Sequence, residues 1–314
     1  MSENQPFEEA GTFMGVPAAR KLSGNLAAIL GIPFDCGVHP TRIGARLGPQ
    51  AIRQQSGLVR RYEPPFRDFD PIERLRLVDC GDVKVRPSYI SEAFANIDRA
   101  VSEIVTAGAI PVTMGGDGAV TLPQLRALHR RHPGLVVLHI DAHTDAYPDD
   151  GVSKYTTATT FTRAAEEGVV DTENSIHLGA RGPIAYQGIF EYTRRWGYEL
   201  IAGAELERQG IPAILAYIRK RLEGRPVYLC FDMDVFDPSV APGVCTPTWG
   251  GLTAKEGLAL LDGLAGLDFV AFDVNTVSPP HDSAGMTAFL AGTVILKCLQ
   301  AAAIGLDRKN APPP

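Results

Sequence analysis

The sequence predicts a single α/β domain built on one parallel sheet. Eight short apolar runs alternate with helical stretches along the chain, and this alternation is typical of β-α-β units. The runs are apolar throughout and do not alternate with polar residues, as expected for strands that helices cover on both faces. No linker, repeat or low-complexity region divides the 314 residues. We therefore expect one domain.

The predicted strands and helices leave two long stretches without periodicity. Residues 34–50 and 145–161 are expected to be loops over one edge of the sheet. Ligands of open parallel sheets bind beyond the carboxyl ends of the strands, so the residues at those ends are the functional candidates. The predicted strands are 25–35, 75–83, 110–117, 135–143, 175–182, 198–203, 227–235 and 269–277, and the helical stretches include 91–108, 121–132, 211–224 and 253–266.

The composition indicates a globular protein of a reducing compartment. The net charge is −6 without a basic block, which argues against nucleic acid as a partner. The five cysteines are scattered and form no CxxC pair, so we expect free thiols and a cytoplasmic location. The N-terminus is acidic and polar, unlike a signal peptide. Lys297 and Gln300 interrupt the apolar stretch 286–306, which favours a packed helix over a membrane span.

Two of the predicted strands end in clusters of carboxylates. DAHTD supplies Asp141, His143 and Asp145, and DMD supplies Asp232 and Asp234. Residues i and i+2 of an extended strand point to the same side. The two pairs could therefore face one spot if the strands are neighbours, and Asp145 could curl back over that spot where its strand ends.

Such a group of carboxylates needs protons or a cation between its members. Two unit charges 4 Å apart repel by about 4 kcal/mol at an effective dielectric of about 20. Carboxylates with an imidazole suit Mn²⁺, Fe²⁺, Ni²⁺ or Zn²⁺ better than Ca²⁺. The sequence therefore predicts a divalent-metal site. The simpler alternative is that Asp141 and Asp232 only cap the loops that follow them.

Six motifs make the chain resemble the ureohydrolase family of arginases, agmatinases and related amidinohydrolases. They follow the family's order and extend over nearly the whole chain. The first and the fifth are nearer to the agmatinase branch than to the arginase branch. The motifs are GARLGPQAIR (44–53), GGD (115–117), DAHTD (141–145), FDMDVFDPSVAPG (231–243), TPTWGGLT (246–253) and FDVNTVSP (272–279).

The resemblance implies an arginase-like fold, a three-layer α-β-α sandwich with a parallel sheet of roughly eight strands, assembled as a trimer or hexamer. It also implies two divalent ions, usually Mn²⁺ and in some members Ni²⁺, bridged by a hydroxide that attacks the carbon of a small guanidino substrate. The family's ligand positions correspond here to Asp141, His143, Asp145, Asp232 and Asp234.

The chain departs from the family pattern at one metal ligand. The family motif GGDH ends in a histidine that binds the first ion, whereas this chain has Gly118. The resemblance then leaves Asp141, Asp145 and Asp232 for the first ion, and we expect that position to be weak or empty. We expect one ion or none in this chain. His139 is interpreted as a packed or hydrogen-bonded core residue and not as a substitute ligand.

Two further departures affect the substrate side. Thr157 stands where relatives carry a histidine that shuttles protons or orients the substrate, and a hydroxyl does not titrate near neutral pH. Thr276 stands where relatives carry a glutamate that pairs with the guanidinium. Both are expected to be substrate-binding positions that have lost their function, and no catalytic residue is assigned.

Three readings of these losses remain open. In the first, the chain is a degraded subunit that supports an active ureohydrolase paralogue in a homo- or hetero-oligomer, as in a metformin-hydrolase-type heteromer. In the second, it is an active amidinohydrolase with a retooled site. In the third, Asp141, His143 and Asp232 hold a single metal in a deacetylase-like amidohydrolase, although a tandem histidine pair is lacking. Whether the chain is itself an enzyme stays open. We expect hydrolysis of linear amidines by the complex and little by this chain alone.

The domain division follows from these motifs. Residues 1–20 are expected to form an N-terminal arm, 21–305 the ureohydrolase domain, and 306–314 a disordered tail. No membrane segment is expected.

Overall fold

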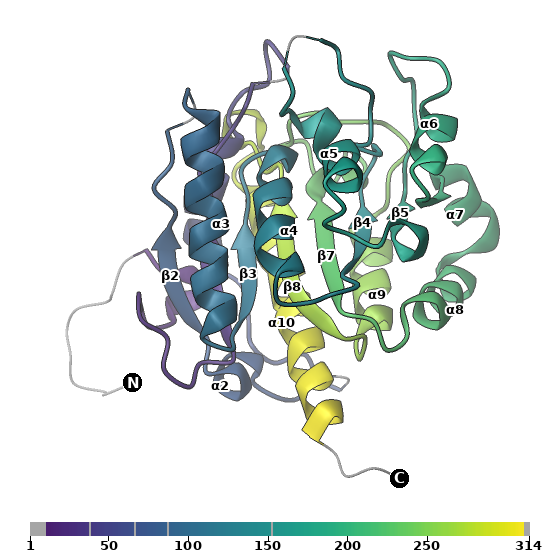
Figure 1. Ribbon diagram of the computed structural model, residues 1–314. Coiled ribbons are helices and arrows are strands. Elements are labelled where there is room, and N and C mark those ends of the chain that lie inside the picture. The colour runs from purple at the N-terminus through teal and green to yellow at the C-terminus, as the bar shows by residue number, and fades with distance from the viewer. Residues whose placement is uncertain (1–10, 38, 66, 87, 152, 311–314) are drawn as a thin grey trace, which may run out of the picture.

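Eight parallel strands form one sheet in the order β2-β1-β3-β8-β7-β4-β5-β6 (Figure 1). The computed structural model describes residues 11–310 except 38, 66, 87 and 152. Each predicted strand segment contains one strand, so the predicted fold class is confirmed. The strands are β1 Ala27–Gly31, β2 Val78–Asp82, β3 Ile110–Met114, β4 Val136–Ile140, β5 Ile176–Leu178, β6 Glu199–Ile201, β7 Val227–Asp232 and β8 Phe269–Asn275.

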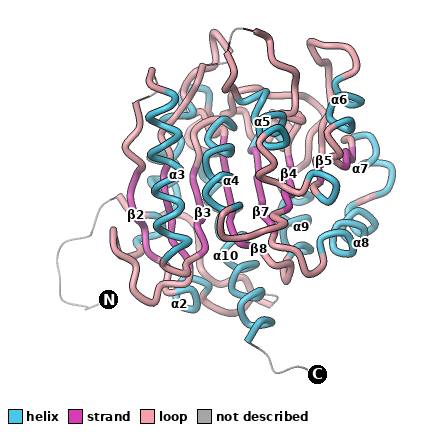
Figure 2. The backbone as a smooth tube through the Cα atoms, in the orientation of Figure 1, coloured by secondary structure: helices cyan, strands magenta, loops and turns pink. Residues whose placement is uncertain are grey.

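Helices cover both faces of the sheet. In Figures 1 and 2, α3 and α4 lie in front of the sheet, and α9 and α10 lie behind it. The helices are α1 Gly48–Ser56, α2 Pro71–Leu75, α3 Ile90–Thr106, α4 Thr121–His129, α5 Thr160–Glu166, α6 Ile189–Arg195, α7 Gly203–Gln209, α8 Ile211–Leu222, α9 Ala254–Leu264 and α10 Met286–Asn310.

The apolar strands are buried on both sides. Ala27 and Ile29 of β1 belong to one hydrophobic cluster, whereas Ala28 and Leu30 of the same strand belong to another. Successive side chains of a strand point to opposite faces, so each strand contributes to two cores. This explains why the strand segments read as unbroken apolar runs.

The predicted loops contain helices that periodicity did not reveal. Helix α1 begins at Gly48, inside the stretch 34–50, and α5 begins at Thr160, inside the stretch 145–161. Pro49 lies in the first turn of α1, a position that proline favours. Helices α1 and α5 have nine and seven residues, and so short a segment shows little periodicity.

The C-terminal helix extends beyond its predicted end. Helix α10 continues to Asn310, so the boundary between the domain at 305 and the tail 306–314 is corrected. No proline interrupts residues 306–310, and nothing there ends the helix. Residues 311–314, like residues 1–10 of the N-terminal arm, lie outside the described part of the chain.

Helix α10 is packed inside the protein. By length and composition, Met286–Arg308 could cross a membrane, but 67% of its most apolar window is buried. The ammonium group of Lys297 lies 3.0 Å from the carboxylate of Asp262 on α9. These are features of a core helix, as predicted for this stretch.

The sheet order brings distant segments together at its centre. Strands β3, β8, β7 and β4 are successive neighbours, although β3 and β8 are far apart in the sequence. Because the strands are parallel, the segments that follow them meet at one edge. Figure 2 shows long loops gathered at that edge, at the top of the view.

Candidate metal centre

The candidate site lies where β4 and β7 end side by side. Ile140 of β4 pairs with Phe231 of β7, which places Asp141 and Asp232 next to each other. Both carboxylates are buried, with 1% and 2% of their surface exposed. The two acidic clusters therefore meet, as expected for neighbouring strands.

Two tight turns, and not extended strands, bring the next ligands to this spot. Strand β4 ends at Ile140 and β7 at Asp232. The backbone N–H of His143 donates to Asp141 Oδ1 at 2.5 Å, and that of Asp234 donates to Asp232 Oδ1 at 2.8 Å. Each strand-end aspartate thus closes a turn with its own side chain. The extended geometry expected from the sequence is corrected in this respect, while the residues still converge.

Asp234 joins the two turns. Its Oδ1 accepts the backbone N–H of Ala142 at 3.1 Å, and its Oδ2 lies 3.2 Å from His143 Nδ1. The same nitrogen lies 3.2 Å from Asp141 Oδ1. Asp141, His143 and Asp234 offer ligand atoms within 4.8 Å of one another. Two carboxylates and an imidazole in this arrangement fit a divalent transition-metal ion.

Asp145 approaches the same cluster from the loop after β4. Its backbone is left-handed, with φ of 46°, a conformation that turns the chain back over the strand end. Asp145, Asp141 and His139 form a second group with ligand atoms within 4.8 Å, and all three residues are buried. Asp145 therefore lies where the sequence predicted.

Asp232 is held by neighbours on both sides. Its Oδ1 accepts the N–H of Asp234 and the hydroxyl of Thr276. Thr276 is buried and has a left-handed backbone with φ of 66°, which is strained for a β-branched residue. Among the described residues, Asp232 belongs to neither of the two ligand groups.

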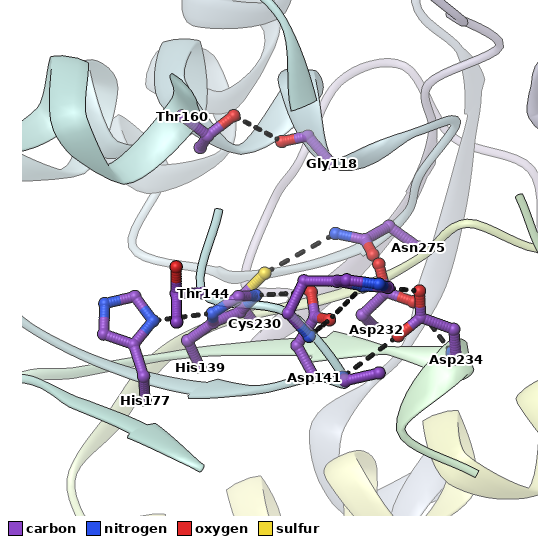
Figure 3. A network of polar contacts seen from close by, with 12 residues as sticks. Gly118, His139, Asp141, Thr144, Thr160, His177, Cys230, Asp232, Asp234 and Asn275 are labelled. Carbon is purple, nitrogen blue, oxygen red and sulfur yellow. Dashed lines mark hydrogen bonds and ion pairs between the residues drawn. The ribbon is translucent and has the colours of Figure 1, made fainter. Parts of the chain in front are cut away.

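Gly118 leaves little room for a side chain. A Cβ atom added there would lie 2.9 Å from Asp145 Oδ2 and 3.0 Å from Thr157 Cγ2. The hydroxyl of Thr160 donates to the Gly118 carbonyl at 3.1 Å (Figure 3), which ties this turn to the start of α5. Thr157 thus occupies part of the space that a ligand at position 118 would need.

Burial and mutual repulsion keep protons in the cluster. Burial raises the pKa values of Asp145, Asp232 and Asp234, and neighbouring carboxylate charges raise them further. Burial also acts to raise the pKa of Asp141, but its two histidine neighbours outweigh this and hold it well below the usual range. Burial lowers the pKa of His143, but the facing carboxylates raise it overall. A divalent cation would replace these protons.

A cavity of about 470 Å³ opens above the cluster. Its lining includes His143, Asp145 and Asp234 from the predicted ligands, and also Thr157 and Thr276. A larger hollow of about 780 Å³ lies between β2 and α3 and shares no residue with this site. Only the first of these two cavities contains the predicted metal ligands, and it is therefore the candidate substrate pocket.

Sequence reasoning assigned no role to Asp117, which also lines this cavity. Burial raises the pKa of its carboxyl to about 6. Its Oδ2 accepts the N–H of Cys36 at 2.6 Å, and its Oδ1 accepts that of Ala119 at 3.2 Å. The signal was available, because Asp117 follows β3 and carboxylates after strands are the candidates in this fold.

Residues 25–300 match the model of the Arginase family. The chain belongs to this family of ureohydrolases. It is 37% identical over 289 residues to the guanidinopropionase of Pseudomonas aeruginosa, covering 92% of this chain and 90% of that protein. The agmatinase of Edwardsiella ictaluri is 37% identical over 273 residues, 86% of each chain. The solved structure of proclavaminate amidino hydrolase from Streptomyces clavuligerus has a TM-score of 0.90 at 34% identity, covering 94% and 97% of the two chains.

These relatives support the agmatinase-like branch of the ureohydrolases and its metal-dependent hydrolytic chemistry. In this chain, Asp141, His143 and Asp234 fit one divalent ion. The second ion that the family implies would lack the imidazole after GGD, because Gly118 has no side chain and Thr157 takes up part of the space. The described residues thus fit one ion well and the usual pair of ions poorly.

Proposed function

We propose that this chain is a catalytically degraded ureohydrolase subunit that supports an active paralogue in guanidine or biguanide hydrolysis, as in a metformin-hydrolase-type heteromer. The observation that carries the proposal is the filled space at Gly118, which faces Asp145 and Thr157 within 3.0 Å. The subunit would bind one Mn²⁺ or Ni²⁺ ion, assemble as a trimer or hexamer, and act in the cytoplasm.

The substrate side supports the same proposal. A bound ion would supply an acidified water, but a proton carrier and a partner for the guanidinium are also needed. The Thr157 hydroxyl oxygen lies 3.9 Å from Cys36 Sγ, and this neutral hydroxyl is the polar group of the side chain. The hydroxyl of Thr276 is engaged with Asp232. Neither side chain supplies a charge to a guanidinium.

A mixing experiment tests the proposal. The purified chain is assayed for urea release from guanidino and biguanide compounds with Mn²⁺ or Ni²⁺, alone and after co-expression with a ureohydrolase paralogue from the same genome. We expect little or no turnover by the lone chain and higher turnover by the mixed oligomer than by the paralogue alone. Equal activity of the paralogue with and without this chain would contradict a supporting role.

The second candidate is an active amidinohydrolase with a retooled site. The open cavity of about 470 Å³ above the carboxylates favours it, because a purely structural subunit has no need of one. Turnover of a guanidino compound by the lone chain, abolished by Asp232→Ala, would support this candidate. The deacetylase-like hypothesis has less support. Among the described residues, the histidines that line the cavity are His39 and His143, and His143 already belongs to the ligand cluster.

A further inference from the structure

Two buried histidines stand in line behind the metal cluster. His139 of β4 pairs in register with His177 of β5, and both are 1% exposed. Figure 3 shows the imidazoles of His177 and His139 in a row that leads to Asp141. The proposed ion would use Asp141, His143 and Asp234, so neither of these two histidines has a role in holding it.

Two short contacts link these side chains, and the nitrogen at the far end of His177 decides their direction. His139 Nε2 lies 2.9 Å from Asp141 Oδ2, and an ionised carboxylate only accepts, so Nε2 carries the proton. The other nitrogen, His139 Nδ1, is an acceptor in the imidazole form and a donor in the imidazolium form. His177 Nδ1 lies 2.8 Å from it, and we take His177 Nδ1 as the donor for the reason that follows.

The surroundings of His177 Nε2 indicate that His177 Nδ1 donates to His139. His177 Nε2 is buried and has no hydrogen-bond partner. In the opposite direction, with His139 Nδ1 as the donor, His177 would be protonated at Nε2, which would bury an N–H without an acceptor, and unpartnered buried side-chain groups are rare. In the inferred direction, His177 Nε2 carries no hydrogen and is an acceptor without a donor.

Aromatic packing fixes both rings. The ring centre of Phe161 lies 4.4 Å from the ring centre of His139 and 4.9 Å from that of His177. On the β6 side, the ring centre of Tyr198 lies 4.6 Å from that of His177. The Tyr198 hydroxyl donates to the Phe161 carbonyl at 2.9 Å. The two imidazoles therefore have little freedom to turn away.

We infer that His139 and His177 are positioning residues: His177 sets the tautomer of His139, which holds Asp141 Oδ2 and leaves Oδ1 facing His143 and Asp234. The inference rests on the proposed single-ion site for its functional meaning. Residues that orient metal ligands through hydrogen bonds typically change metal affinity by about 10- to 100-fold when removed. Through these two hydrogen bonds, a residue of strand β5 would also help to position the metal ligand Asp141.

Nitrogen NMR on the metal-free protein tests the hydrogen-bond direction without any substitution. With histidine-selective ¹⁵N labelling, we expect His139 to be protonated at Nε2 only and His177 at Nδ1 only. Protonation of His139 at both nitrogens, or a bare Nε2, would overturn the inference. So would a shift of His139 Nε2 to a metal-bound value when Zn²⁺ is added, because His139 would then be a ligand.

Mn²⁺ titration of substituted chains tests the positioning role. His177→Phe removes the donor and should weaken Mn²⁺ binding by about 10-fold, the lower end of the range for supporting residues. His177→Asn keeps an N–H donor at the place of Nδ1 and should restore most of the affinity. His129→Phe on α4, outside the cavity lining, is the matched control and should bind normally.

Two results separate this inference from the proposed function. Equal Mn²⁺ affinity of the His177→Phe and unmodified chains would overturn the positioning role while leaving the single-ion site intact. Absence of Mn²⁺ binding in every chain would contradict the proposed site, and the NMR measurement would still decide the hydrogen-bond direction.

Discussion

At the residue scale, small changes decide what the site can do. Gly118 stands where the resemblance implies an imidazole, and atoms of Thr157 and Asp145 lie within 3.0 Å of the place where a Cβ would be. Thr276 replaces the expected carboxylate and turns its hydroxyl toward Asp232. Gly118, Thr157 and Asp145 are neighbours, so the effects of changes at these three positions on metal binding should be coupled.

Restoring the lost histidine alone should fail. Gly118→His forces a side chain against Thr157 Cγ2, and overpacking of this kind costs about 1–3 kcal/mol. Thr157→Ser removes that methyl group and keeps the hydroxyl. We expect Gly118→His to bind no second Mn²⁺ and Gly118→His/Thr157→Ser to be more stable and to gain one, measured by denaturant unfolding and elemental analysis. Equal stability of the single and double variants would contradict the coupling.

The Thr276 hydroxyl should stabilise the fold. Thr276→Val keeps the branched shape but leaves Asp232 Oδ1 without its hydroxyl donor, which should lower the free energy of unfolding by about 1–3 kcal/mol. Thr276→Ser keeps the donor and should retain most of the stability. A Val variant as stable as the Ser variant in urea unfolding would show that the hydrogen bond contributes nothing.

At the element scale, strands were more predictable than short helices. The eight strands follow from apolar runs buried on both faces, and the meeting of Asp141 with Asp232 follows from β4 and β7 being neighbours. The turns closed by these aspartates could not be predicted, because they depend on side-chain hydrogen bonds. The role of His177 was also hidden, since only the pairing of β4 with β5 brings it to His139.

The buried carboxyl groups of the metal centre should make the free energy of unfolding depend on pH. Folding raises the pKa values of Asp145, Asp232 and Asp234 above their unfolded values near 4. At these three carboxyls the folded state then binds more protons than the unfolded state, so they should lower the stability of the metal-free protein as pH rises above about 4. Thermal unfolding across this range measures the effect.

Added Mn²⁺ and the substitution Asp145→Asn are the two controls for this pH dependence. Mn²⁺ replaces protons, so the increase in Tm that it produces should grow with pH. Asp145→Asn removes one titrating group and should flatten the metal-free profile. Stability of the metal-free protein that rises with pH over this range would contradict the assignment.

At the scale of the whole molecule, the family fold surrounds a centre that we propose to be incomplete. Residues 25–300 match the Arginase family, and the fold is shared with proclavaminate amidino hydrolase at a TM-score of 0.90. Because the family fold is retained, we propose that the chain still assembles with a partner subunit. The losses that we propose lie after β3, after β8 and in the loop before α5.

Metal content measures the central claim most directly. The chain is purified alone, dialysed against Mn²⁺ or Ni²⁺, and analysed for bound metal per chain, with urea release followed in the same sample. The account predicts no more than one ion per chain and negligible urea. Two tightly bound ions per chain together with rapid urea production would contradict it.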